Sequence, residues 1–145
     1  MLEISVLGQL QISLNGGPIT NLSTGKVQAL LAYLVVENAY PHRREKLAGL
    51  LWSEFMDSSA RTNLRQSVAR LRRIVPDEAI LSTRQTVRFD PEFAYSLDLD
   101  QFSELLSRYQ QQGDITYLHQ AVQLYRGDFL DQLWLEAVSY THLTL

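Results

Sequence analysis

One stretch of the sequence decides the fold, and it reads Ala60-Arg61-Thr62-Asn63-Leu64-Arg65-Gln66-Ser67-Val68-Ala69-Arg70-Leu71-Arg72-Arg73. Its apolar residues recur at the period of a helix, at Leu64, Val68, Leu71 and Val75. That period is typical of an amphipathic α-helix that buries one stripe. Serine and aspartate just before the stretch can cap its start, and Pro76 ends it. We therefore expect a helix over about Ser59–Val75.

This helix is basic on the side that faces away from the stripe. The helix has five arginines and only one acid, Asp57, so ion pairs within the helix cannot explain why so many arginines are present. An α-helix fits the major groove of DNA, where arginine pairs with guanine and asparagine or glutamine pairs with adenine. A small residue there can reach the thymine methyl group. We predict base contacts from Asn63, Gln66 and Arg70, with Thr62 and Ala69 close by.

The remaining arginines of the helix suit the DNA backbone. Phosphate contacts supply most of the affinity of DNA-binding proteins and fix the register of the recognition helix. We predict that phosphates are held by Arg61, Arg65, Arg72 and Arg73. The alternative is a solvated helix that is merely rich in arginine.

The flanking segments favour the DNA-binding interpretation. A helix expected over residues 43–52 comes one short connection earlier, as in a helix-turn-helix unit. A hairpin follows, with strands at 80–82 and 86–89. Arg84 lies near its tip and Arg88 in its second strand, and we predict that both belong to a DNA-binding wing. An earlier helix is expected over residues 25–38.

Strands and further helices surround this central part. Residues 3–8 and 9–14 alternate between apolar and polar, and a turn signal follows at 15–18, so we expect a small antiparallel sheet with a third strand at 19–22. Asp90-Pro91 marks a domain boundary. Three helices are expected beyond it, over 99–112, 115–125 and 128–137. The tail 138–145 has no clear period and is interpreted as a possible non-native addition.

The ordered set of motifs resembles a known family. The order sheet, three helices and hairpin is similar to the winged helix of OmpR/PhoB-type effector domains. The match is closer to bacterial transcriptional activators of the antibiotic regulatory protein (SARP) type. It rests on the quoted stretch together with Leu7-Gly8, Ala29-Leu30-Leu31-Ala32-Tyr33-Leu34, Arg44-Glu45-Lys46-Leu47-Ala48 and Leu51-Trp52.

The resemblance implies an α+β chain with two domains. The first, over 1–90, is a winged helix-turn-helix with an N-terminal antiparallel sheet. The second, over 96–137, resembles the start of the family's all-α, tetratricopeptide-like bacterial transcriptional activator domain (BTAD), here truncated. Its resemblance rests on Leu97-Asp98-Leu99-Asp100-Gln101-Phe102 and on residues 121–130.

Composition separates the two halves and excludes several classes of function. The net charge is −3, yet residues 1–90 carry +3 and residues 91–145 carry −6. Such asymmetry is expected where one part meets a polyanion. Cysteine is absent, and no signal peptide or membrane-spanning run is recognised, which suggests a cytoplasmic protein. The histidines stand isolated and no nucleophile has an activating neighbour, so we expect no metal, no cofactor and no enzymatic activity.

The predicted function is sequence-specific binding of double-stranded DNA in the regulation of transcription. The acidic helical part would contact protein instead: RNA polymerase, as the family implies, or a second copy in a homodimer. The alternative is a protein–protein interaction module, in which the arginine face docks on an acidic partner. No membrane partner is expected.

Overall fold

The computed structural model describes residues 1–19, 25–127 and 129. The chain forms two compact units, each described here by itself. The first unit joins Met1–Ile19 to the described residues of Ala94–Gln132, and the second contains the described residues 25–93. The first unit is therefore built from two segments that are distant in the sequence.

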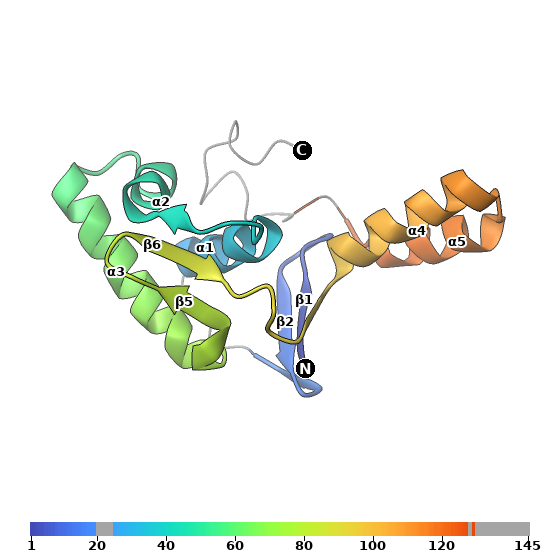
Figure 1. Cartoon of the computed structure of the whole chain (residues 1–145), viewed down its shortest axis with the longest axis horizontal. Helices are drawn as coiled ribbons and strands as arrows, with labels where there is room; N and C mark the ends of the chain where they lie inside the picture. The colour runs from blue at the N-terminus through green and yellow to red at the C-terminus, as the bar shows by residue number, and fades with distance from the viewer. Residues whose placement is uncertain (20–24, 128, 130–145) are drawn as a thin grey trace. The chain divides into compact units, whose positions relative to one another are not determined.

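The first unit contains a four-stranded sheet of strand order β3-β2-β1-β7. β1 (Leu2–Ser5) and β2 (Gln11–Leu14) are antiparallel neighbours (Figure 1), with Leu2 opposite Leu14 and Ile4 opposite Ile12. β3 (Gly17–Pro18) follows the turn at Asn15 and Gly16, both of which have positive φ. Asn-Gly is the pair that a tight hairpin turn of this kind favours. The sheet thus has its third strand two residues earlier than predicted, and residues 20–22 lie outside the described ones.

The fourth strand of this sheet comes from much later in the chain. β7 (Tyr95–Leu97) pairs parallel with β1, placing Leu97 beside Ile4. Sequence patterns did not predict β7, because it has three residues and a partner about ninety residues away. The N-terminal sheet shares its compact unit with the later helices, and the predicted domains at 1–90 and 96–137 stay a prediction.

Two helices complete the first unit. α4 (Asp98–Gln112) and α5 (Ile115–Leu124) form a hairpin (Figure 1), close to the predicted ranges. Gly113 ends α4 with φ 72°, and the Asp114 side chain caps α5 by accepting the N–H of Thr116. The helix predicted over 128–137 and the tail 138–145 lie outside the described residues, apart from Phe129.

The start of α4 is fastened to the sheet by a buried carboxylate. Asp98 accepts hydrogen bonds from the backbone N–H groups of Val6 at 2.8 Å and Leu7 at 3.1 Å. Buried backbone donors need acceptors, so this side chain satisfies the two that follow β1. It gives the hairpin a fixed attachment to the sheet.

The second unit contains three helices and a small antiparallel sheet. Its helices are α1 (Gly25–Val36), α2 (Arg44–Leu51) and α3 (Asp57–Ile74), and a 3-10 turn, η1 (Asp77–Ala79), follows them. Its sheet has the order β4-β6-β5, formed by β4 (His42–Arg43), β5 (Ile80–Ser82) and β6 (Thr86–Phe89). The predicted helices and hairpin are observed, and β4 is an addition.

The core of the second unit lies among α1, α3 and β6. α1 buries an almost unbroken apolar run from Ala29 to Val35, so it is covered on most sides. α3 buries only one stripe, formed by Ala60, Leu64, Val68 and Leu71. β6 adds Val87 and Phe89 from one face of the sheet. Each fully buried large side chain contributes about 1.5–3 kcal/mol, so this core fixes the orientation of α3.

Candidate nucleic-acid interface

Helix α3 buries one apolar stripe, so its opposite, polar face points outward. Arg61, Arg65, Gln66, Ala69, Arg70 and Arg73 are exposed, whereas Thr62, Asn63 and Arg72 are half-buried. Thr62 donates its hydroxyl to the carbonyl of Ser58 at 3.0 Å, one turn earlier, so it has a partner within the helix. Most side chains predicted to meet DNA therefore share one accessible surface.

Two grooves border this face. The first, of about 800 Å³, lies between the start of α2, the first half of α3 and the hairpin turn, and its lining residues are Arg44, Glu45, Arg61, Leu64, Arg65, Ser82, Thr83, Arg84 and Gln85. The second, of about 430 Å³, is lined by Val27, Gln66, Ser67, Ala69, Arg70 and Arg73. We call them the wing groove and the α1 groove. The wing groove brings together Arg61, Arg65 and Arg84, while Thr62, Asn63, Arg72 and Arg88 line neither groove.

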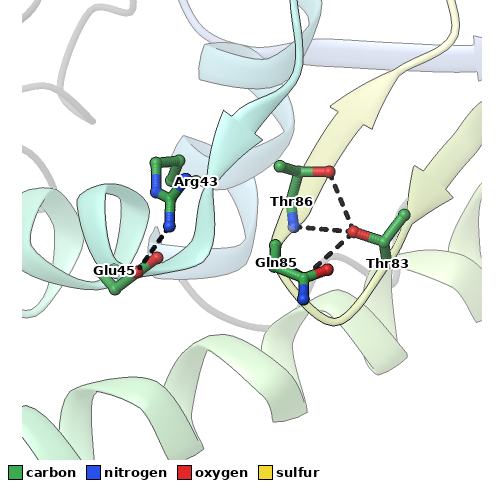
Figure 2. A network of polar contacts seen from close by, with 5 residues as sticks. All are labelled: Arg43, Glu45, Thr83, Gln85 and Thr86. Carbon is green, nitrogen blue, oxygen red and sulfur yellow. Dashed lines mark hydrogen bonds and ion pairs between the residues drawn. The ribbon is translucent and has the colours of Figure 1, made fainter.

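The hairpin turn that carries Arg84 is held by its own side chains. The hydroxyl oxygen of Thr83 accepts the N–H groups of Gln85 at 3.1 Å and Thr86 at 2.9 Å, and it lies 3.1 Å from the Thr86 hydroxyl (Figure 2). Such a turn restricts the backbone on both sides of Arg84. The tip of the predicted wing thus has a defined shape before any ligand arrives.

Arg44 joins the start of α2 to that turn. Its backbone N–H donates to the carbonyl of Gln85 at 2.9 Å, and its side-chain Nε donates to the carbonyl of Thr83 at 2.8 Å. Arg44 belongs to a motif that carries the family resemblance, but sequence patterns predicted no role for it at the site. No periodicity signals such a residue, because its importance depends on a turn 39 positions later.

The structure gives Arg72 and Arg88 partners within the protein, while the DNA contacts predicted for them stay predictions. Arg72 donates to the Asp77 carboxylate at 2.9 Å and to the Ser82 hydroxyl at 2.6 Å, tying the end of α3 to the hairpin. Hydrogen bonding to Asp77 raises the pKa of Arg72, and the same bond lowers the pKa of Asp77.

Arg88 serves α1 rather than the outer surface. It donates to the carbonyl of Asn38 at 2.8 Å, and His42 lies 2.6 Å from the carbonyl of Glu37 through Nε2. Both carbonyls follow the C-terminus of α1, where donors and positive charge are favourable. Arg88 therefore anchors the sheet to α1, and the DNA contacts predicted for Arg84 and Arg88 stay predictions.

The charges in the wing groove act on one another. Burial lowers the pKa of Arg44, and the positive charge of Arg65 lowers it further. The pKa of Glu45 is lowered most by a hydrogen bond from its own backbone N–H and next by the hydrogen bond from Arg43. The charge of Arg61 lowers it further, more weakly. Arg43 is 3.3 Å from the Glu45 carboxylate (Figure 2). The groove is therefore strongly cationic, with one carboxylate at its edge.

No other kind of site is apparent in the described part of the chain. No group of three or more His, Cys, Asp or Glu side chains gathers there as a metal site would require. No described helix is both long enough and apolar enough to cross a membrane. The polar face of α3 with its two grooves is the candidate functional site.

The second unit is a winged helix-turn-helix, and comparison with known proteins relates the chain to a bacterial transcriptional regulator. The chain is 34% identical over 74 residues to the transcriptional regulatory protein EmbR of Mycobacterium tuberculosis and of Mycobacterium bovis. The match covers 51% of this chain and 19% of each relative. No family model matches the sequence.

The structure is similar to a solved one. Mycobacterium tuberculosis EmbR, in complex with a low-affinity phosphopeptide, matches with a TM-score of 0.70 and 28% identity. That match covers 91% of this chain and 38% of the solved chain. The predicted fold class, α+β with a winged helix and a following helical segment, is confirmed. The chain spans about a fifth of the length of the regulators it matches in sequence.

Proposed function

We propose that this chain binds double-stranded DNA sequence-specifically and regulates transcription, with α3 in the major groove and the turn around Arg84 as the wing. The observation that carries the proposal is the exposed polar face of α3, which combines cations with amide side chains beside a cationic groove. A duplex offers phosphates to such cations and hydrogen-bonding base edges to such amides. The relation to a transcriptional regulator supports the same conclusion.

The residues divide into two groups in this proposal. Base edges are read by Asn63, Gln66 and Arg70, with Thr62 and Ala69 close by. Backbone phosphates are held by Arg61, Arg65, Arg73 and Arg84. Arg72 and Arg88 have protein partners, so we assign them to the fold that holds α3 and the hairpin in place.

The family proposal concerns the whole protein. We infer an OmpR/PhoB-type winged helix followed by a BTAD, as in a cytoplasmic activator of the SARP type. The helical unit would then contact RNA polymerase or a second copy of the chain. Immunoprecipitation of RNA polymerase with the chain, compared with a variant lacking residues 98–124, checks the first contact. Sedimentation at increasing concentration checks the second.

Selection of bound duplexes from a random pool tests the DNA proposal. Gln66→Ala is expected to cost about 1–3 kcal/mol on the selected site and to relax the preference at one base pair. Arg73→Ala is expected to weaken selected and random duplexes alike and to flatten the salt dependence. Arg108→Ala is the matched control, because its guanidinium pairs with Glu104 within α4. If the two α3 variants act identically on both duplexes, the division into base and phosphate contacts is wrong.

A second candidate function is a protein–protein interaction module. The exposed apolar side chains of α5, Ile115 and Val122, favour it, because they are 57% and 61% exposed. A salt titration with a random duplex separates the two candidates. Absence of measurable binding at low salt would contradict the DNA proposal and favour this one.

A further inference from the structure

The wing groove holds more positive charge than the protein itself neutralises. Among the described residues, the side chains of Arg61, Arg65 and Arg84 take part in no hydrogen bond or ion pair, and Arg44 is bonded only through Nε and its backbone. Glu45 is the sole acid that lines the groove, and its carboxylate is paired with Arg43 outside it. Four arginines thus line one open space, and the one carboxylate that also lines it is paired with Arg43.

The positive charges of Arg44 and Arg65 lie close enough to repel one another. The charge of Arg65 lowers the pKa of Arg44, and Arg44 cannot swing away without breaking its bond to the carbonyl of Thr83. Like charges held together in a groove are relieved by an anion bound between them. Guanidinium groups are suited to that task, because each offers paired N–H donors that match two oxygens of one phosphate.

The elements that line the groove suggest the form of that anion. Its walls come from α2, α3 and the hairpin turn, so a ligand lying in it touches the recognition helix and the wing together. A DNA backbone strand passes between those two elements when the helix lies in one groove of the duplex and the wing in the next. A phosphodiester is therefore the ligand that fits both the charge and the placement.

We propose that Arg44 is a DNA-binding residue, which together with Arg65 holds a single backbone phosphate in the wing groove. This inference rests on the proposed function and adds to it a residue on α2 that sequence patterns did not assign. Because the same side chain bonds Thr83, Arg44 also fixes the turn that carries Arg84. Phosphate binding and wing placement thus depend on one residue.

A double-mutant cycle with the full chain tests the shared phosphate. The variants are Arg44→Gln, Arg65→Gln and the two combined, each titrated with a random-sequence duplex at several salt concentrations. Each single change is expected to weaken binding roughly tenfold and to reduce the salt slope by about one. The double variant is expected to lose far less affinity than the product of the two single fold-losses, because both changes remove the same contact.

Two controls bracket the result. Arg43→Gln changes the neighbouring arginine, which is exposed, pairs with Glu45 and does not line the groove, and we expect less than a twofold change. Arg73 lines the α1 groove, so Arg44→Gln combined with Arg73→Gln is expected to be multiplicative. Should thermal melting show that Arg44→Gln unfolds, Arg44→Met, which keeps the apolar stem of the side chain, replaces it in the cycle.

The outcomes separate this inference from the proposed function. Wild-type protein that fails to bind a duplex at low salt contradicts the proposed function itself. Wild-type binding with multiplicative effects of the Arg44 and Arg65 changes, or with no effect of Arg44, overturns the shared phosphate and leaves the proposed function standing.

Discussion

Helices α3 and α4 are both long and amphipathic, yet they use their charges in opposite ways. In α4, the single arginine, Arg108, is 2.8 Å from the carboxylate of Glu104 one turn earlier. In α3, four of the five arginines lie on the exposed face, and the bonds of Arg72 lead out of the helix, to Asp77 and Ser82. The difference teaches that internal pairing, rather than amphipathicity or arginine content, distinguishes a surface helix from a candidate ligand-binding one.

The two helices also differ in how deeply they are embedded. The stripe of α3 is nearly inaccessible, with Leu64 at 1% and Leu71 at 0% exposed. The apolar residues of α4, such as Phe102 and Leu105, are only half-buried. A recognition surface needs a fixed helix beneath it, so the deeper stripe suits the binding role that we propose for α3.

The largest expected effect tests this difference in embedding. Leu64→Ala should destabilise the second unit by about 2–5 kcal/mol, because it removes a fully buried side chain and leaves a cavity. Leu105→Ala, the same change in a half-buried position, should destabilise the first unit by about half as much or less. Hydrogen exchange monitored amide by amide reports the two units separately. Equal losses would show that the two helices are embedded alike.

An intermediate effect is expected at the start of α4. Asp98→Ala leaves the N–H groups of Val6 and Leu7 without their acceptor in a buried place, which should destabilise the first unit by about 1–3 kcal/mol. Glu104→Ala is the matched control, because it removes an acid of the same helix that is exposed. Urea denaturation followed by circular dichroism measures both. A control that proves as costly as Asp98→Ala would remove the special role of the buried carboxylate.

The smallest effect concerns the exposed carboxylate that follows α3. The bond to Arg72 lowers the pKa of Asp77, so its stabilisation is present above the ordinary pKa of aspartate and is lost as the pH falls through the lowered value. Asp77→Asn should therefore lower the melting temperature slightly at pH 7 and make no difference in strong acid. Melting curves of both proteins across that range check the convergence. A gap that persists in strong acid would mean that the ion pair is not its cause.

Sequence patterns predicted the local elements of the second unit because each is encoded locally. The stripe of α3 needs only the spacing of Leu64, Val68 and Leu71, and the hairpin needs only two short β-prone runs around a polar turn. β4 escaped prediction because a two-residue strand has no periodicity. β7 escaped because its partner, β1, lies at the other end of the chain.

The sequence predicts which residues make up the candidate site but not which hydrogen bonds they form. The exposure of Gln66, Ala69 and Arg70 follows from the helical wheel. The helical wheel does not predict that Arg72 bonds Asp77 or that Arg88 bonds Asn38, because those partners belong to other elements or loops. The same reason hides Arg44, whose neighbours in space are the hairpin turn and Arg65.

The parallel pairing of β1 with β7 has a consequence for the order of events during synthesis. β1 is made about ninety residues before its parallel neighbour, with the described helices and hairpin of the second unit between them. Domains fold as units while the chain grows, at about 5–20 residues per second. The nascent chain therefore carries an unfinished sheet edge for several seconds, while the winged helix, whose segments are contiguous, can complete itself. The part that we propose to bind DNA can thus become native before the unit that contains β1 and β7.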